Sequence, residues 1–421
     1  MIGLTILTAA LSAVFSIAAP SAGSPEKASY DEAAIRPYSL PDPLLTLSGR
    51  PVRTVRRWVR RRRPEILEQF TREMFGESPK LPRRTLFHVL EESSSALGSK
   101  ATRRQVSISF DGEWTDSLVL LIYTPNGLDE PAPCFLGVNF WGNWTVSTDP
   151  AILKPSAARL QGYGNKQIRP DRGASQSRWP LEEIISRGYA VATFYRGDID
   201  PDFDDGFKNG VHGVLDKGKE RDAESWGTVA AWAWGLRLCL DYLEKDPDID
   251  GRKVAVFGHS RLGKTALWAG ATDRRFAMVI SNCSGCSGAA ISRRRIGETV
   301  DIINYKFPHW FCTNYRKYNC REWDLPFDEH ELIALAAPRP VYVASASEDN
   351  WADPKGEYLS LVGASPVYSL YGYEGFTSYV PPGIEQPVVT GRMGYHIRRG
   401  KHDIALYDWL RYLDFADRFL K

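Results

Sequence analysis

Short runs of apolar residues alternate with helix-like segments along most of this chain, and this alternation constrains the fold more than any other feature of the sequence. Buried strands are expected at 133–142, 189–199, 253–260, 276–281 and 340–346. Their consecutive apolar residues are typical of strands covered on both faces. Helices are expected at 222–245, 263–271 and 402–421. The sequence therefore predicts an α/β fold, with a mostly parallel sheet sandwiched by helices.

One long segment, 285–335, separates two of the predicted strands. We expect it to form an insertion over the end of the sheet at which α/β proteins carry their active sites. No convincing linker follows residue 50. We therefore predict one catalytic domain over residues 51–421, preceded by an N-terminal extension over residues 24–50.

The first 23 residues are typical of a secretory signal peptide, although no Lys or Arg precedes the apolar run that begins at Ile2. Small residues crowd the end of this run, and polar residues follow Gly23. A single membrane anchor is the competing interpretation, because the run approaches the length that spans a bilayer. No basic cluster follows directly, so we expect cleavage near Gly23, a secreted or periplasmic protein and no membrane span in the mature chain.

The charges of the chain almost cancel, since 53 Lys and Arg face 51 Asp and Glu and give a formal net charge of +2. A dedicated nucleic-acid-binding protein would carry a clear basic excess, so the balance argues against that class. Apolar residues make up 43% of the chain, which excludes intrinsic disorder. The six cysteines of an exported chain permit up to three disulfides. We expect a monomer.

Ser260 lies in the sequence GHSRLGK, at the end of a predicted strand and just before a predicted helix. A sharp turn between strand and helix, a nucleophile elbow, presents a serine hydroxyl at the carboxyl end of a sheet. Such a turn needs small neighbours, and here the second glycine comes one place later than in G-x-S-x-G. A helix N-cap is the plainer interpretation of this serine. Its position between strand and helix favours a nucleophile.

A serine nucleophile needs a base and an acid, and after such an elbow they follow in the order acid, histidine. His402 opens the last predicted helix and is the expected base, with His396 as the alternative. Asp349 follows the predicted strand 340–346 and is the expected acid, because a carboxylate there can orient the histidine and stabilise its imidazolium. Glu348 and Asp353 in the same loop are the alternatives.

Several stretches of the chain resemble the glucuronoyl esterases of carbohydrate esterase family 15, and the resemblance runs from about residue 60 to the end. They are GHSRLGK, SGCSGAAISRRRIGETV, HWFCTNYRKYN, PRPVYVASASEDNWADPKGEYL and GYHIRRGKHDIALYDWLRYLDFAD. GHSRLGK is similar to the family's G-C-S-R-x-G-K signature, which is far more specific than a serine elbow alone. The resemblance implies an α/β-hydrolase fold and an enzyme that cleaves the ester between glucuronic acid on xylan and lignin alcohols.

The resemblance also implies roles for single residues. By position, Ser260 would be the nucleophile, His402 the base and Arg261 a support for the oxyanion. The hydroxyls of the uronate ring would be held by Lys264, Glu298 and Trp351. No metal or cofactor is expected, and the expected partner is a glucuronoxylan or lignin–carbohydrate ester. The run Arg293-Arg294-Arg295 could attract this polyanion, although a solvated loop is the simpler interpretation.

Two departures from the family pattern bear on the site. Many members carry an acid in an E-S-G or D-S-G context where this chain has Cys283-Ser284-Gly285, so Asp349 must supply the carboxylate. Fungal members have cysteines beside the serine and the histidine, where this chain has His259 and Asp403. Two other functions stay open: a deacetylase of xylan on the same fold, and a degenerate carbohydrate-binding protein with an inactive site.

Overall fold

The structure is a computed structural model that describes residues 25–110, 118–155 and 171–421. The predicted signal peptide over residues 1–23 lies outside the described residues. Within the described part of the chain, no helix is both long enough and apolar enough to cross a membrane.

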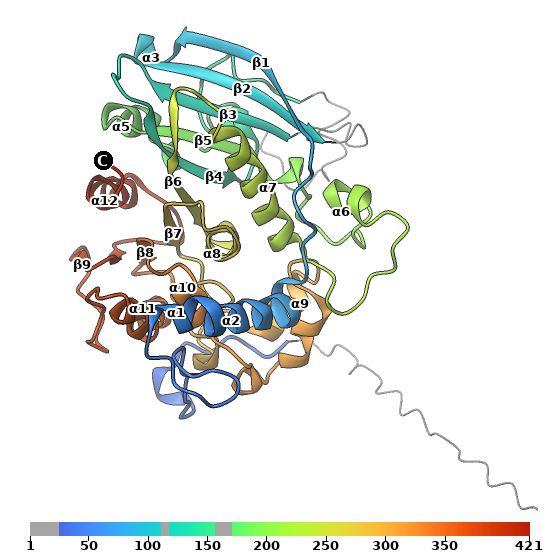
Figure 1. The fold of residues 1–421 in the computed structure, drawn as a ribbon, viewed down its shortest axis with the longest axis vertical. Coiled ribbons are helices and arrows are strands. Elements are labelled where there is room, and N and C mark those ends of the chain that lie inside the picture. Colours follow the sequence, from blue (N-terminus) through green and yellow to red (C-terminus); the bar gives the residue numbers. More distant parts are fainter. Residues whose placement is uncertain (1–24, 111–117, 156–170) are drawn as a thin grey trace, which may run out of the picture.

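The described strands form one ten-stranded mixed sheet (Figure 1). They are β1 (Thr85–Ser95), β2 (Ala101–Phe110), β3 (Leu118–Pro125), β4 (Ala132–Asn139), β5 (Ala190–Tyr195), β6 (Ile249–His259), β7 (Met278–Asn282), β8 (Val341–Ala346), β9 (Val388–Thr390) and β10 (Met393–Arg398). Their order is β1-β2-β3-β5-β4-β6-β7-β8-β10-β9. The strands from β5 to β10 in this order run parallel, whereas the strands at both edges pair antiparallel.

Helices cover both faces of the sheet, which confirms the predicted sandwich (Figure 1). Alternate residues of β6 enter two separate cores, Val254 and Val256 on one face, Ala255 and Phe257 on the other. The first face is covered by α7 (Thr228–Leu243), α8 (Arg261–Thr272) and α11 (Pro354–Leu370). On two of these helices, α8 and α11, packs α10 (Glu329–Ala334), which in turn contacts α2 (Arg63–Phe70). The second face is covered by α5 (Leu181–Ser186) and α12 (Leu406–Asp417).

The described residues contain four further α-helices. They are α1 (Val55–Arg57), α3 (Ala96–Ser99), α6 (Gly210–Leu215) and α9 (Val300–Lys306). The last of them belongs to the predicted insertion over residues 285–335, which also contains α10.

The closing helix begins later than the sequence pattern predicts. It was expected from residue 402, but α12 starts at Leu406. The Asp408 carboxylate accepts a hydrogen bond from the backbone N–H of Ala405 at 2.7 Å and so caps the helix at that point. Residues 399–405 are thereby left as a loop, and this loop carries His402.

All six cysteines are free, so none of the disulfides that the sequence permits is present. Cys134 and Cys239 are fully buried in the core between the sheet and the helices of the first face. They behave there as small apolar side chains.

Candidate active site

The carboxyl ends of the parallel strands open into a pocket with a volume of about 240 Å³. Its wall comes from the elbow between β6 and α8, the loops after β7, β8 and β10, and the insertion around α9. Six of the predicted site residues lie in this wall: Ser260, Arg261, Lys264, Glu298, Trp351 and His402. The fold thus brings together residues that are up to 142 positions apart along the chain.

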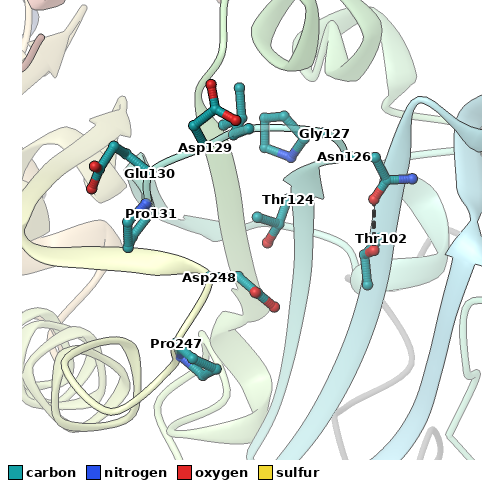
Figure 2. A pocket seen from close by; sticks show the side chains of 11 residues that line it. Thr102, Thr124, Asn126, Gly127, Asp129, Glu130, Pro131, Pro247 and Asp248 are labelled. Atoms are coloured by element: carbon teal, nitrogen blue, oxygen red, sulfur yellow. Dashed lines mark hydrogen bonds between the residues drawn. The ribbon is translucent and has the colours of Figure 1, made fainter.

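A second hollow, of about 320 Å³, lies at the opposite end of the sheet, beside the amino ends of β4 and β6 (Figure 2). Acidic side chains gather around it, namely those of Asp129, Glu130 and Asp248. Figure 2 also shows the hydrogen bond of 2.7 Å between Thr102 and Asn126 at its rim. None of the predicted site residues lines this hollow.

The turn at Ser260 has the strained geometry expected of a nucleophile elbow. Ser260 has a φ of 58° and a ψ of −132°, which residues with a side chain rarely adopt. A Cβ on Gly258 would lie 1.9 Å from the carbonyl oxygen of Leu262, so only glycine fits there. The helix α8 begins directly at Arg261, and the first N–H groups of a helix have no partner within it.

Ser260, His402 and Asp349 form one chain of hydrogen bonds. His402 Nε2 lies 2.9 Å from Ser260 Oγ, and His402 Nδ1 lies 2.6 Å from Asp349 Oδ2. The imidazole is partly open to solvent, with 39% of its side chain exposed, whereas only 2% of the Asp349 side chain is exposed. A buried carboxylate behind a half-open imidazole can fix the ring orientation while the other nitrogen faces the serine.

The alternatives raised by the sequence lie elsewhere. Glu348 is exposed. Asp353 is buried, pairs with Arg294 at 2.7 Å and caps α11 by accepting the backbone N–H of Gly356 at 3.0 Å. His396 is buried beneath the pocket and bonds to Asp408 at 2.8 Å. Among the five candidates for the acid and the base, only His402 and Asp349 belong to the chain of hydrogen bonds that includes Ser260.

Cys283 lies close to this chain of hydrogen bonds, at the place where many family members carry an acid. One ligand atom each of Cys283, Asp349 and His402 fall within 4.8 Å of one another. The thiol makes a long contact of 3.9 Å with the carbonyl oxygen of Asp403. Burial raises the pKa of Cys283 well above its usual value, so the side chain is a neutral thiol.

Arg261 is held in the pocket wall by a group of residues that the sequence analysis did not identify. Asp202 Oδ2 accepts from Arg261 at 2.5 Å and also from Arg196, while Asp202 Oδ1 lies 2.9 Å from His309 Nε2 and 2.7 Å from Trp310 Nε1. We call these five residues the Asp202 cluster. Burial alone would raise the pKa of Asp202, but the two arginines hold it well below its usual value.

Lys264 and Glu298 form a buried ion pair of 2.8 Å beside Ser260. The Lys264 ammonium also donates to the carbonyl oxygens of Ser284, at 2.7 Å, and of Cys286. These three acceptors match the three hydrogens of an ammonium group. A sugar hydroxyl near Lys264 would therefore have to share one of these hydrogens, whereas Glu298 keeps free lone pairs.

The predicted insertion lies over the pocket. Phe307 and Trp310, which follow α9, stack with ring centroids 3.8 Å apart. Arg261 lies over the ring of Trp310, with its guanidinium carbon 4.6 Å from the centroid. Facing them, Trp351 is partly exposed, and Lys306 Nζ lies 4.7 Å from the centroid of its ring. In the sequence, the aromatic run HWF within a long polar insertion was the feature that could have marked Trp310 as a site residue.

The arginine run in the insertion is neither a solvated loop nor an open basic patch. Arg293 pairs with Asp328 at 2.8 Å, Arg294 pairs with Asp353 and Glu32, and Arg295 pairs with Glu322 and Glu26. Arg293 and Arg294 are also buried. Their charges hold the insertion to α11 and to the segment around residues 26–32, and this corrects both interpretations from the sequence.

Comparisons with known proteins agree with the fold. A family model for fungal glucuronyl esterases matches residues 184–372. Carbohydrate esterase MZ0003, from an unknown prokaryotic organism, is 47% identical over 405 residues, which cover 94% of this chain and 93% of that protein.

Two solved structures are similar over almost the whole chain. The glucuronoyl esterase of Solibacter usitatus has 45% identity and a TM-score of 0.87, covering 92% of this chain and 100% of its own. A promiscuous esterase of carbohydrate esterase family 15 from a marine bacterial metagenome has 45% identity and a TM-score of 0.84, covering 93% and 100%. The predicted α/β-hydrolase fold is confirmed, and this chain belongs to carbohydrate esterase family 15, the glucuronoyl esterases, which are carboxylic ester hydrolases.

Proposed function

We propose that this protein is a serine esterase that hydrolyses the ester between (4-O-methyl-)glucuronic acid of glucuronoxylan and lignin alcohols. The observation that carries the proposal is the hydrogen-bonded chain Ser260–His402–Asp349, which opens into a pocket that also contains the Lys264–Glu298 pair and Trp351. The named relatives support the uronate part of the substrate. The predicted signal peptide fits a polysaccharide substrate outside the cell.

In the first half of the reaction, Ser260 acts as nucleophile and His402 as base. As the serine oxygen attacks the ester carbon, its proton passes to His402 Nε2, and the carbonyl electron pair moves onto the oxygen. The buried Asp349 stabilises the imidazolium that forms. His402 then gives the proton to the alcohol oxygen as the carbon–oxygen bond breaks, which leaves the uronate on Ser260.

In the second half, water replaces the alcohol. A water molecule gives a proton to His402 and attacks the acyl carbon, and Ser260 leaves with that proton. In both halves the oxyanion would be stabilised by the first N–H groups of α8 and by the Arg261 guanidinium, which the Asp202 cluster holds in place.

The sugar ring would lie between the insertion and the loop after β8. Trp351 offers a flat ring face, and Glu298 can accept hydrogen bonds from vicinal hydroxyls. Lys264 would support Glu298 as its ion-pair partner and share a hydrogen with the sugar. The alcohol would leave on the solvent side of the partly exposed His402, where a bulky group meets no wall.

The experiment is a comparison of benzyl glucuronate with phenyl acetate as substrates. We expect a clearly higher kcat/KM for the uronate ester, and Ser260→Ala should lower turnover of both by several orders of magnitude while uronate binding survives. A preference for acetyl esters would instead support the xylan deacetylase, which is a real alternative because one relative is called promiscuous. Activity near that of the wild type in Ser260→Ala would overturn the assignment of the nucleophile.

The same two substrates test the sugar-binding residues. Lys264→Ala should raise KM for glucuronate esters by about tenfold, since losing a buried polar contact costs about 1–3 kcal/mol. The acetyl ester, which has no ring hydroxyls, should be barely affected. Equal losses on both substrates would mean that Lys264 supports the loop at Ser284 and Cys286 rather than the sugar.

A further inference from the structure

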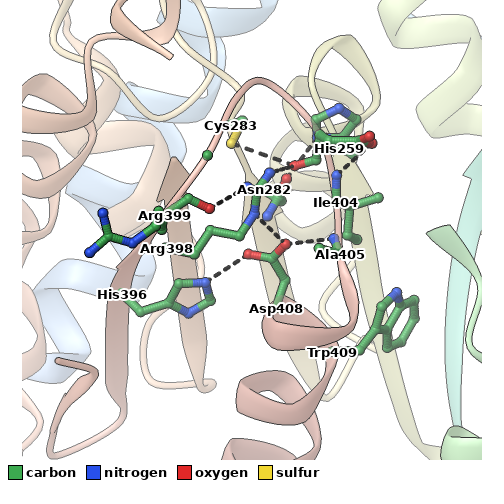
Figure 3. A network of polar contacts seen from close by, with 12 residues as sticks. His259, Asn282, Cys283, His396, Arg398, Arg399, Ile404, Ala405, Asp408 and Trp409 are labelled. Atoms are coloured by element: carbon green, nitrogen blue, oxygen red, sulfur yellow. Dashed lines mark hydrogen bonds and ion pairs between the residues drawn. The ribbon is translucent and has the colours of Figure 1, made fainter. Parts of the chain in front are cut away.

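His402 lies in the loop of residues 399–405, which joins β10 to α12. Figure 3 shows Arg399, Ile404 and Ala405 of this loop. None of the seven loop residues belongs to a helix or a strand, so other contacts must fix the shape of the loop. A base that must stay within hydrogen-bond distance of a serine cannot tolerate a loosely held backbone. The question is therefore which side chain holds this loop.

Arg398 is the last residue of β10 and is 5% exposed. Its Nη1 donates to the carbonyl oxygen of Arg399 at 3.0 Å, and its Nη2 donates to those of Lys401, at 2.8 Å, and Asp403, at 2.6 Å. Lys401 and Asp403 are the two neighbours of His402. One nitrogen atom thus binds the backbone on both sides of the proposed base.

The guanidinium of Arg398 is itself fixed by Asp408, in the first turn of α12. Arg398 Nε donates to Asp408 Oδ2 at 2.8 Å, and Asp408 Oδ1 lies 2.8 Å from His396 Nε2 (Figure 3). The side chains of Asp408 and His396 are fully buried. We call Arg398, Asp408 and His396 the Arg398 cluster. Because Asp408 also accepts the backbone N–H of Ala405, the cluster bonds to alternate residues of the loop, from its first to its last.

The loop after β8, which carries Asp349, is tied to the same backbone. Ser347 N donates to the carbonyl oxygen of Arg398 at 2.8 Å, and Glu348 N donates to that of Gly400 at 2.9 Å. The acid loop and the base loop are therefore held as one unit. A shift of residues 399–405 would disturb both the bond from His402 to Ser260 and the bond from His402 to Asp349.

We propose that Arg398 is a positioning residue for the reaction, which clamps the backbone on both sides of His402 and so sets the distance from the imidazole to Ser260 and Asp349. This rests on the proposed role of His402 as base. Asp408 and His396 orient the guanidinium. The clamp needs the fork geometry of arginine, because a lysine ammonium cannot reach a carboxylate and three carbonyl oxygens at fixed angles.

The chain offers a matched control. Arg339 also donates to several carbonyl oxygens, those of Gly270 at 2.6 Å, Asp273 at 3.0 Å and Phe276 at 3.1 Å. These acceptors precede β7 and so lie at the opposite end of the sheet from Ser260. Losing Arg339 removes a comparable set of backbone contacts without touching the base loop.

The first experiment compares kcat and KM of Arg398→Met, Arg398→Lys and Arg339→Met on benzyl glucuronate and phenyl acetate. For Arg398→Met we expect kcat to fall about 10- to 100-fold on both substrates, with KM within about twofold, because a displaced base affects the transition state and not the binding of the ester. Arg398→Lys should lose nearly as much. Arg339→Met should keep its kcat even where its melting temperature falls.

The second experiment reads the site directly. The short hydrogen bond between His402 and Asp349 should give a downfield imidazole N–H proton signal in NMR spectra of the wild type and of Arg339→Met, and this signal should be lost or broadened in both Arg398 variants. Added guanidinium should restore part of the kcat of Arg398→Met. If that variant does not fold, Arg398→Lys carries both experiments.

Two outcomes would overturn the inference: a normal kcat in a folded Arg398 variant, or equal losses of kcat in the Arg398 and Arg339 variants with the N–H signal intact. The failure of the proposed function looks different. In that case the wild type would not prefer the uronate ester, or Ser260→Ala would stay active, whereas the NMR signal would still report whether Arg398 positions His402.

Discussion

Two arginines that contact elements of the site, Arg261 and Arg398, are used in opposite ways. Arg261, in the Asp202 cluster, lies in the pocket wall with 25% of its side chain exposed. Arg398, in the Arg398 cluster, is turned away from the pocket, with 6% of its side chain exposed and its nitrogens bound to a carboxylate and to backbone carbonyl oxygens. One guanidinium lines the pocket, whereas the other is bound to protein groups away from it.

The difference follows from where charge develops in ester hydrolysis. Beside the oxyanion a positive charge is favourable, so an arginine can face the reacting carbonyl. Beside the base an uncompensated positive charge would oppose the uptake of a proton by His402. There the Asp408 carboxylate lies 2.8 Å from the guanidinium and compensates its positive charge. Arg398 therefore fixes the position of the backbone around His402 without adding an uncompensated positive charge there.

The largest expected effect comes from substituting Asp349, the hydrogen-bond partner of the proposed base His402. Asp349→Asn should keep the fold but lower kcat by about 10³- to 10⁴-fold, because an amide stabilises the wrong tautomer of His402 and cannot stabilise its imidazolium. Steady-state kinetics on benzyl glucuronate would measure this. Cys283→Ala should change little by comparison, since the thiol is neutral.

The position of Cys283 gives this prediction an internal control. The thiol lies near both Asp349 and His402, so Cys283→Glu placed in the Asp349→Asn background should restore part of the lost turnover. Wild-type rates in Asp349→Asn alone would assign the acid to another residue of the same loop.

A smaller loss of kcat is expected when Arg261, the proposed support of the oxyanion, is substituted. Arg261→Met should lower kcat by about 10²-fold with little change in KM, the magnitude typical of losing one oxyanion donor. The kcat of Arg261→Lys should lie between those of the wild type and Arg261→Met, since lysine keeps the charge but not the fixed geometry beside Asp202. If KM rises while kcat stays constant, Arg261 binds the ground state of the substrate and the contrast between the two arginines disappears.

The smallest effect concerns another buried carboxyl, whose described partners include no guanidinium. Glu357 accepts hydrogen bonds from Ser345 Oγ at 2.6 Å and from the backbone N–H groups of Ser284 and Gly285. Burial raises its pKa to about 8. A raised pKa means that the folded protein binds a proton that the unfolded chain releases, so stability falls as pH rises from about 4.5 towards 8.

This dependence can be removed by one substitution. Glu357→Gln imitates the protonated carboxyl, so the variant should lose less stability than the wild type between about pH 5 and pH 8, by about 1–3 kcal/mol. Denaturant unfolding at several pH values would measure the difference, and turnover should hardly change. Parallel stability curves for the two proteins would show that Glu357 is ionised throughout.

Local patterns in the sequence were enough to predict the buried central strands and the sharp turn at Ser260. Apolar runs such as that of β6 reveal buried strands, and the elbow is defined by a strand, a glycine and a helix that are contiguous in the chain. The positions of Asp349 and His402 followed from the order of the residues along the chain. These features depend on neighbours in sequence, which a single chain displays.

Features that depend on distant partners could not be predicted in this way. In β10 the apolar residues Met393, Tyr395 and Ile397 alternate with polar His396 and Arg398, as in a strand with one face in water. His396 and Arg398 are nevertheless buried, because both bind Asp408. Asp202 stands in an acidic turn that is typical of solvated loops, yet it binds Arg261 and Trp310, which are 59 and 108 positions away. Polar residues that are buried through long-range contacts look like surface residues in the sequence.

The free cysteines have a practical consequence. Since the loops around Ser260 are held by ion pairs and backbone hydrogen bonds and no pair of thiols is joined, the fold takes no support from an oxidising environment. Reducing agents should therefore leave its melting temperature unchanged, and the chain without its predicted signal peptide should fold in the reducing cytoplasm of a production host without any disulfide isomerase.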